Sequence, residues 1–369
     1  MGPLSGIRIL EVGGIGPNPF AGMLLADMGA DVIRLDRAVG TGFGQGGAAD
    51  PSLRGRQTLA VDLKTEAGKA LARALAQRAD ALIEGFRPGV MERLGLGPAD
   101  LMAGNAKLVY GRMTGYGQEG PMAGTAGHDL NYISLSGVLG ASQRTGEKPM
   151  FAINTAGDYG GGAVLLAFGV VCALLEARTS GRGQVVDAAM VDGSALLLTM
   201  VHALHAAGAW NETPGTNVLD SGAHFYEVYA TADGGHVAVA AIEPQFYARL
   251  LELLELPAQE LPQWEQARWP AFKATFSEVF SSRSTEAWAA LLEHDQACAT
   301  VVRGPFEAHL HPHLAARGTF VEIDGVLAPA PAPRFSRTPV AARPAQRDPA
   351  AALARWGVNP GTLDPSVSG

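Results

Sequence analysis

The chain has 369 residues, of which 47% are hydrophobic and 17% are charged, and its formal net charge is −8 at pH 7. A disordered chain would be poorer in apolar residues and richer in charge, and a collagen would show a Gly-X-Y period, so both classes are excluded. The acidic balance, with no basic stripe along the chain, also argues against nucleic acid as a partner.

The first 110 residues alternate between strand and helix patterns. Short apolar runs predict strands at residues 7–12, 31–35, 81–84 and 107–113, and periodic segments predict helices at residues 20–28, 66–78 and 98–102. This βαβ rhythm predicts an α/β fold with a Rossmann-like parallel sheet that is covered by helices. Ligands of such folds bind at the carboxyl ends of the strands.

The middle of the chain is largely helical. Apolar helices are predicted at residues 128–137, 158–177 and 191–206, with a possible fifth strand at residues 184–189. Residues 160–175 carry no charge, but sixteen residues are fewer than the roughly twenty that a membrane-spanning helix needs. We therefore expect a buried core helix and no membrane partner.

The last third of the chain predicts a second group of elements. Strands at residues 225–229 and 236–241 flank an Asp-Gly-Gly turn, which is a strong hairpin signal. Helices are predicted at residues 245–256, 270–281, 285–292 and 349–356, and the Ala- and Pro-rich residues 327–344 predict an extended connector.

Only two cysteines, Cys172 and Cys298, are present. Two are too few for a disulfide framework, and the first residues lack a signal-peptide layout, so we expect a cytoplasmic protein with reduced thiols.

Two further motifs resemble ligand-binding sites, a dinucleotide fingerprint and a histidine metal site, but the residues around them do not fit either ligand. A dinucleotide fingerprint starting at Gly14 would require glycine where Pro19 stands, although the helix N-terminus remains suited to an anion. His309, His311 and His313 alternate, but no cysteine or carboxylate cluster accompanies them, so a surface loop is expected and no metal site.

Two titratable residues stand at predicted helix starts. At His128 the positive end of the helix macrodipole favours the neutral imidazole, which can accept a proton near pH 7. Asp158 begins the next long helix, where an N-cap is the common role of aspartate. Gly160, Gly161 and Gly162 follow, each costing about 1 kcal/mol of helix stability relative to alanine, which suggests a close approach of backbone and ligand.

Four ordered motifs carry a resemblance to a known family. They are Gly127-His128-Asp129-Leu130-Asn131-Tyr132, Gly157-Asp158 with its glycines, residues 183–193 and Ala241-Ile242-Glu243-Pro244-Gln245-Phe246-Tyr247. In these motifs the chain resembles the racemase branch of the CaiB/BaiF, or family III, CoA-transferase superfamily. The similarity extends from Leu4 to about Arg337 and is weakest at residues 38–51 and after Pro339.

The resemblance implies a racemase that moves a proton at the α-carbon of a 2-methylacyl-CoA through an enolate. His128 and Asp158 would serve the two opposite faces of that carbon, Glu243 would pair with His128, and Asn154 with backbone N–H groups would stabilise the enolate oxygen. The alternative within the family is a CoA-transferase in which Asp158 is the nucleophile. A non-catalytic CoA-binding protein is the third hypothesis.

The resemblance also implies which residues bind the substrate, with CoA as part of the substrate and no separate cofactor. The positions matching the family are Arg37, Val61, Asp62, Leu63, Lys64, Gly85, Phe86, Arg87, Gly127, Asp129, Leu130, Asn131, Tyr132 and Tyr226. Residues 1–100 carry 11 basic and 11 acidic side chains, so this part is the better place for an anionic CoA. Two departures, Gln57 for a basic residue and His224 for proline, affect the expected phosphate contacts and acyl pocket.

We expect the chain to consist of four segments and to associate with a second copy of itself. A large CoA-binding domain covers residues 1–190, a linker helix and connector residues 191–214, and a smaller α/β domain residues 215–325. The resemblance implies that residues 326–369 return to the large domain, and that two chains form an interlocked homodimer in which Glu243 reaches His128 of the other subunit.

Overall fold

The structure is a computed structural model that describes residues 2–37 and 50–359. It divides the chain into two compact units. The first comprises Met1–Val138, Ala152–Leu198 and Pro312–Gly369, and the second comprises Leu139–Phe151 and Thr199–His311. Residues 139–151 therefore belong to the second unit and residues 312–325 to the first, which differs from the boundaries expected from the sequence.

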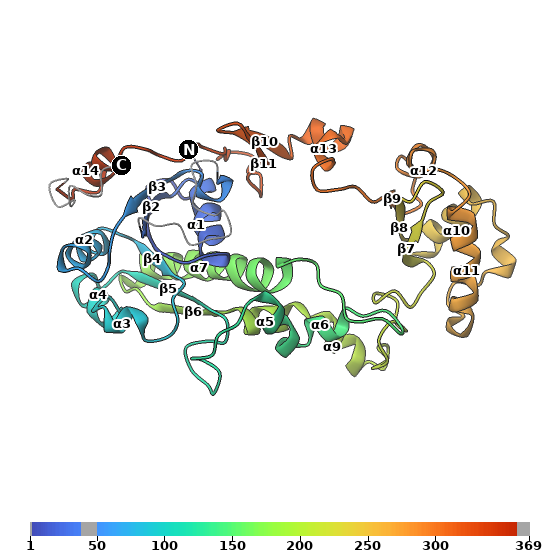
Figure 1. Ribbon diagram of the computed structural model, residues 1–369, viewed down its shortest axis with the longest axis horizontal. Helices are drawn as coiled ribbons and strands as arrows, with labels where there is room; N and C mark the ends of the chain where they lie inside the picture. Colours follow the sequence, from blue (N-terminus) through green and yellow to red (C-terminus); the bar gives the residue numbers. More distant parts are fainter. Residues whose placement is uncertain (1, 38–49, 360–369) are drawn as a thin grey trace. The chain divides into compact units, whose positions relative to one another are not determined.

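The first unit is built on a six-stranded sheet in which all strands are parallel (Figure 1). The strand order is β3-β2-β1-β4-β5-β6. The strands are β1 (Arg8–Val12), β2 (Asp31–Asp36), β3 (Arg56–Ala60), β4 (Ala81–Glu84), β5 (Val109–Thr114) and β6 (Val185–Ala189). The four predicted strands and the possible fifth are confirmed. Strand β3 was not predicted, because this edge strand begins with Arg56, Gln57 and Thr58 and lacks an apolar run.

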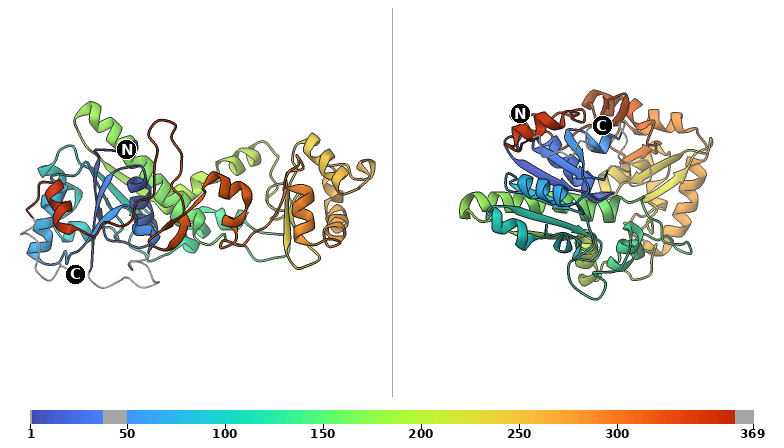
Figure 2. Two further views of the ribbon diagram at one scale, coloured as in Figure 1. Left: turned by 90° about the horizontal axis from the view of Figure 1, so that it is seen from above. Right: turned by 60° about the vertical axis from the view of Figure 1, so that its left-hand side comes forward.

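Helices cover both faces of this sheet. One face packs on α1 (Pro17–Asp27), the π-helical segment η2 (Thr155–Val164) and α7 (Leu165–Ser180). The other packs on α2 (Glu66–Ala76), α4 (Pro98–Gly104) and α14 (Pro349–Arg355). Strand side chains alternate between the two cores, with Leu10 in one and Ile9 in the other. Helix α14 lies beside the sheet in Figures 1 and 2, so residues 349–355 belong to this unit.

The remaining elements of the first unit are short. They are η1 (Pro51–Leu53), α3 (Val90–Arg93), α5 (Asp129–Ser136), α8 (Met190–Leu197), α13 (Pro312–Arg317) and the hairpin of β10 (Phe320–Ile323) and β11 (Val326–Pro329). Strand β11 occupies the start of the segment that was expected to be an extended connector.

Within the described residues, one helix, Thr155–Ser180, is long and apolar enough to cross a membrane. It has 26 residues, so the expectation that it is too short to span was wrong. Its most apolar stretch is 44% buried, and Leu166 and Val170 pack fully buried under the sheet. The core helix of a globular protein has the same composition, so this finding by itself does not indicate a membrane.

The second unit combines a three-stranded antiparallel sheet with helices. The strands β7 (Tyr226–Ala230), β8 (His236–Ala240) and β9 (Ala299–Val301) are adjacent in that order. The helices are α6 (Val138–Ala141, which begins in the first unit), α9 (Thr199–Ala206), α10 (Pro244–Leu253), α11 (Trp269–Phe280) and α12 (Thr285–Leu292), with short turns η3 (Ala258–Glu260), η4 (Gln266–Arg268) and η5 (Ala308–Leu310). The predicted hairpin is confirmed by the pairing of Ala230 with His236. The predicted helix 191–206 is divided into α8 and α9 at Leu198.

Aromatic side chains form the core of the second unit. Phe276, Phe280 and Trp288 are at most 1% exposed, and the Phe280 ring lies against each of the other two. His224 lies in this core with no exposed surface, edge-on to Phe276. It is therefore a core residue, and the expectation that it changes a ligand pocket finds no support in this unit.

The alternating histidines do not form one loop. His309 lies in η5, His311 follows it, and His313 lies in α13. The His311 Nε2 atom is 3.3 Å from a carboxylate oxygen of Glu293.

Candidate active site

A cavity of about 600 Å³ opens at the carboxyl ends of the strands in the first unit. Its walls come from the segments that follow β1, β4 and β5, together with the starts of α5, η2 and α8. The lining residues are Ile15, Gly16, Pro17, Asn18, Gly85, Phe86, Arg87, Pro88, Met113, Thr114, Gly115, Tyr116, Ala123, Thr125, Ala126, Gly127, His128, Tyr132, Asn154, Asp158 and Met190. The strand order reverses between β1 and β4, and this is where open α/β sheets bind ligands.

His128 enters the cavity from the N-terminus of α5. Its backbone N–H donates to Asn131 Oδ1 at 3.1 Å, which caps the helix without using the imidazole. The Tyr132 hydroxyl donates to the carbonyl of Gly127 and fixes the residue before His128. Burial raises the pKa of Tyr132 to about 12, so this hydroxyl stays protonated. The imidazole is exposed and faces the cavity.

Asp158 enters the cavity from η2. The helix begins three residues earlier, at Thr155 after the N-cap Asn154, so Asp158 is not the N-cap that its position predicted. The Nδ2 group of Asn154 donates to Asp158 Oδ2 at 3.1 Å. Burial raises the pKa of Asp158, the Asn154 hydrogen bond and His128 lower it, and the charge of Asp129 raises it. The net shift is upward, so a protonated Asp158 is easier to reach than in an exposed aspartate.

Asp129 positions Asp158. Its Oδ1 atom accepts the backbone N–H groups of Gly157 at 2.8 Å and of Asp158 at 2.7 Å. The Asp129 side chain is 6% exposed and is absent from the described residues that line the cavity. These two N–H groups are therefore occupied, and the expectation that N–H groups at this helix start face an enolate oxygen does not apply to them.

The glycines after Asp158 serve packing. A Cβ atom at Gly161 would lie 2.5 Å from the backbone nitrogen of Ser194 in α8, and one at Gly162 would lie 2.8 Å from Met190 Cγ. A Cβ atom at Gly157 would lie 2.5 Å from the Asp129 carboxylate. Gly161 and Gly162 therefore admit α8, and Gly157 admits the Asp129 side chain, so the prediction that a ligand explains the glycines is wrong for Gly161 and Gly162.

The expected CoA-binding residues in the first part of the chain follow the strands β2, β3 and β4. Arg37 is exposed directly after β2, residues 61–64 follow β3, and Gly85, Phe86 and Arg87 follow β4 and line the cavity. Because the strands are parallel, all three segments lie at the carboxyl edge of the sheet. Val61 is 5% exposed and packs in the core of the first unit.

Three residues that were discussed as substrate contacts, Leu130, Asn131 and Gln57, have other environments in the structure. Leu130 is 41% exposed and Asn131 caps α5, and neither is among the described cavity-lining residues. Gln57 is 3% exposed and donates to the carbonyl of Thr58 at 2.9 Å, so its side chain faces the interior.

Glu243 and Tyr226 belong to the second unit. Tyr226 begins β7, and Glu243 follows β8 as the N-cap of α10. Because β7 and β8 are antiparallel, with Tyr226 opposite Ala240, both residues lie at the same end of the hairpin. Glu243 is exposed and Tyr226 is half-buried.

Sequence reasoning missed the wall segments after β1 and β5. Ile15, Pro17 and Asn18 follow β1, Thr114 ends β5, and Tyr116 follows β5. The signal was available, because the carboxyl ends of parallel strands share one edge of a sheet. The glycine cluster at residues 13–16 was expected to precede a helix N-terminus suited to an anion, but the residues around it were not assigned to a cavity.

Comparison with known proteins agrees with this architecture. The model of the CoA-transferase family III matches residues 4–351. The chain belongs to CoA-transferase family III. This family III chain is 45% identical to the alpha-methylacyl-CoA racemase of Mus musculus over 94% of its length and 90% of that protein. It is 42% identical to the alpha-methylacyl-CoA racemase of Homo sapiens over 91% of its length and 87% of that protein.

A solved structure supports the fold. The CaiB/BaiF family protein from Brucella suis superposes with a TM-score of 0.81, covering 96% of this family III chain and 98% of that chain at 24% identity. The predicted α/β fold with a Rossmann-like parallel sheet is confirmed.

Proposed function

We propose that this family III protein is an α-methylacyl-CoA racemase, which interconverts (R)- and (S)-2-methylacyl-CoA thioesters by 1,1-proton transfer. The observation that carries the proposal is that His128 and Asp158 enter one cavity from two different helix N-termini. The similarity to the two racemases named above supports the same reaction.

Inversion requires two groups, because the proton leaves one face of the α-carbon and returns to the opposite face. One base takes the proton, and the C–H electron pair moves into the thioester to form an enolate. The other group, initially protonated, donates its proton to the opposite face and re-forms the C–H bond. His128 and Asp158 exchange these roles when the reaction runs in reverse.

The environment of Asp158 supports its role as an acid in one direction. Its partial burial raises the pKa, which brings a protonated carboxyl group closer to the working pH. Asn154 fixes the carboxylate with one N–H bond, and its second N–H can serve an oxyanion in the cavity.

CoA would lie along the carboxyl edge of the sheet, with Arg37, Lys64 and Arg87 as the cations nearest to its phosphates. CoA belongs to the substrate, and no separate cofactor is proposed.

We further propose a homodimer in which Glu243 of one subunit fixes the His128 imidazole of the other. Exposed apolar side chains of the first unit support a protein partner: Phe168 and Leu175 on α7 are 65% and 69% exposed, and Leu196 on α8 is 60% exposed. Sedimentation equilibrium measures the mass directly. A monomer with full activity would contradict this arrangement.

The reaction is tested with purified protein, (S)-2-methylacyl-CoA and D₂O. NMR follows α-deuterium uptake and the epimer ratio. Uptake together with epimerisation supports the racemase. If the protein leaves the α-proton in place and moves CoA to a free carboxylic acid, the transferase alternative is correct.

A further inference from the structure

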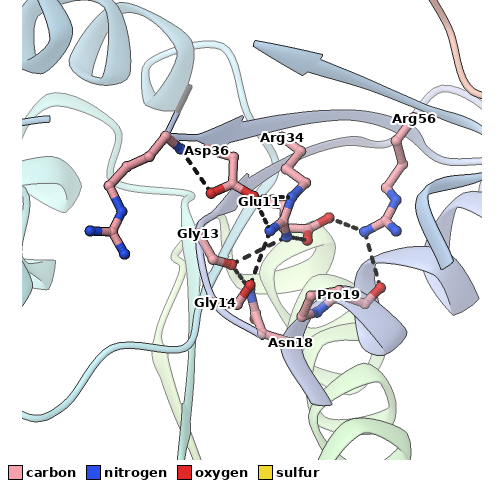
Figure 3. A network of polar contacts seen from close by, with 9 residues as sticks. Glu11, Gly13, Gly14, Asn18, Pro19, Arg34, Asp36 and Arg56 are labelled. Atoms are coloured by element: carbon pink, nitrogen blue, oxygen red, sulfur yellow. Dashed lines mark hydrogen bonds and ion pairs between the residues drawn. The ribbon is translucent and has the colours of Figure 1, made fainter. Parts of the chain in front are cut away.

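A buried network of ion pairs lies beneath the loop that joins β1 to α1 (Figure 3). Glu11 on β1 is fully buried and pairs with Arg34 on β2 and Arg56 on β3. Arg34 also pairs with Asp36 at the end of β2. The guanidinium of Arg34 is therefore held on two sides by carboxylates.

Arg34 extends this network into the glycine loop, residues 13–16. Its guanidinium donates to the carbonyl of Gly14 at 3.0 Å and to that of Gly13 at 3.3 Å (Figure 3). The side-chain amide of Asn18 donates to the same Gly13 carbonyl at 2.9 Å. Gly13 and Gly14 both have positive φ, 55° and 91°, so the loop has a conformation that few other residues adopt. Only a forked donor such as arginine can hold two carboxylates and two carbonyls at once.

The network also reaches the other end of the loop. Arg56 donates to the carbonyl of Pro19, in the first turn of α1, at 3.0 Å. The backbone on both sides of Gly16 is therefore tied to the Glu11 carboxylate through an arginine.

The glycine loop borders Asp158. A Cβ atom at Gly16, which has a φ of 63°, would lie 3.4 Å from Asp158 Oδ2. Four residues later in α1, the ring of Phe20 stacks on Tyr159, with 4.5 Å between the ring centroids. Ile15 and Gly16 line the cavity beside Asp158. Movement of this loop would change the wall against which the Asp158 carboxylate lies.

From these contacts we propose that Arg34 is a positioning residue that holds the glycine loop against Asp158 and so sets proton transfer at the Asp158 face of the substrate. The inference rests on the proposed two-base function. His128 belongs to a different wall, at the start of α5, so a disturbed loop affects the two bases unequally. A misplacement of about 1 Å can reduce the rate of such a step about a hundredfold.

The test compares the rate of inversion with the rate of retention, both measured in the same reaction mixture. Each epimer of a 2-methylacyl-CoA is incubated separately in D₂O, and NMR measures α-deuterium uptake with retention and with inversion. For the epimer whose α-proton faces His128, retention needs only His128, whereas inversion also needs Asp158. In Arg34→Lys we expect the ratio of inversion to retention to fall at least about tenfold. A smaller folded fraction lowers both rates equally and leaves this ratio unchanged.

Arg54→Lys is the matched control. Arg54 is also buried in the first unit, pairs with Asp27 at 2.9 Å and donates to a backbone carbonyl, that of Pro329, at 2.8 Å. None of these groups lines the cavity among the described residues. We expect a comparable loss of thermal stability and a wild-type ratio. Asp36→Asn, which loosens Arg34 while leaving Glu11 paired, should lower the ratio less than Arg34→Lys and decides the question if Arg34→Lys does not fold.

Two outcomes overturn the inference. One is a wild-type ratio in folded Arg34→Lys, or in Asp36→Asn if only that variant folds. The second concerns the loop alone and is needed if the wild-type protein exchanges no α-proton. That result contradicts the proposed function but does not test whether Arg34 holds the loop. Loop anchoring is then measured by amide hydrogen exchange of the non-proline residues among 13–20. Faster exchange in Arg34→Lys than in Arg54→Lys supports the positioning role, and equal exchange overturns it.

Discussion

The two units of the chain are stabilised by different kinds of buried side chains. In the first unit, charged groups cross between strands, as Glu11 does with Arg34 and Arg56 and as Glu84 does with Arg112. Removing such charges from water costs several kcal/mol for each ion, and only good geometry offsets that cost. In the second unit the interior is aromatic, and burial of apolar surface is the main source of stability.

The difference corresponds to the location of the cavity, which is lined by residues of the first unit. The charged networks of the first unit end on the loops that form the cavity: Arg34 on the carbonyls of the glycine loop, and Glu84 on the backbone N–H of Phe86 at 2.7 Å. The aromatic core stabilises a compact sheet and its helices but holds no described residue of that cavity. Substitutions that disturb the cavity in the first unit should therefore change activity, whereas substitutions in the aromatic core of the second unit should mainly change stability.

The largest effect is expected from Asp158→Asn, which keeps the shape of the side chain and removes its proton transfer. Inversion should fall by about a thousandfold, because a positioned general acid–base contributes roughly 10²–10⁴ in rate. Deuterium uptake with retention should persist for the epimer whose α-proton faces His128. Asp192→Asn, at an exposed acidic residue in the first turn of α8, serves as the control and should keep both rates. Inversion at the wild-type rate in Asp158→Asn would remove this residue from the mechanism.

Trp288→Ala tests the aromatic core. Trp288 is 1% exposed, contacts Phe280 and donates its indole N–H to the Phe280 carbonyl at 2.8 Å. Loss of such a side chain costs about 3–5 kcal/mol of unfolding free energy, which urea denaturation measures. Isothermal titration with CoA should give an unchanged affinity, since Trp288 lies in the second unit. A large loss of CoA affinity in the folded variant would show that the two units do not divide the roles in this way.

Much of this division could be predicted from the sequence. Apolar runs identified five of the six parallel strands, the turn residues identified the β7–β8 hairpin, and the positions of His128 and Asp158 at helix starts identified the two groups that share the cavity. These signals are local, because strand, helix and turn periodicities extend over only a few residues.

The contacts that connect distant segments could not be predicted in the same way. Glu11 and Arg56 are 45 residues apart in sequence, and Asp129 lies 28 residues before Gly157, whose N–H it accepts. A single charged residue in a strand has no periodicity, so its partner becomes visible only once the strand order is known. The glycines of η2 were misinterpreted for the same reason, since the helix they contact, α8, follows about 30 residues later.

His224→Phe tests the buried imidazole of the aromatic core. The Tyr247 hydroxyl donates to the Leu261 carbonyl at 2.9 Å, so His224 Nε2 donates to Tyr247 at 2.7 Å and Nδ1 carries no proton. Burial lowers the pKa of His224 to about 4, and nearby Lys273 adds to this shift. The unfolded chain therefore binds the proton more readily, and wild-type stability falls as the pH decreases from about 6.5 to about 4.

In His224→Phe this part of the acid sensitivity should disappear. It amounts to at most about 3 kcal/mol, since one pKa unit corresponds to about 1.4 kcal/mol. Urea denaturation of both proteins at pH 7.5 and at pH 4.5 measures the difference. Parallel loss of stability in the two proteins would show that His224 does not titrate in this range.

Glu84→Gln tests the opposite sign of pH dependence in the first unit, with the smallest expected effect. Burial raises the pKa of Glu84 to about 7, although the Phe86 N–H and Arg112 act in the other direction. The folded chain binds this proton more tightly than the unfolded chain, so Glu84 makes wild-type stability fall as the pH rises from about 4.5 to about 7. Glutamine carries no charge at any pH and removes this contribution, which we expect to be about 1–3 kcal/mol. Urea denaturation at pH 4.5 and pH 7.5 should show a wild-type protein that loses more stability than the variant over this interval. If the variant loses as much, Arg112, which also pairs with Glu92 at 2.8 Å, keeps Glu84 ionised throughout, and the buried charges of the first unit are permanent ion pairs.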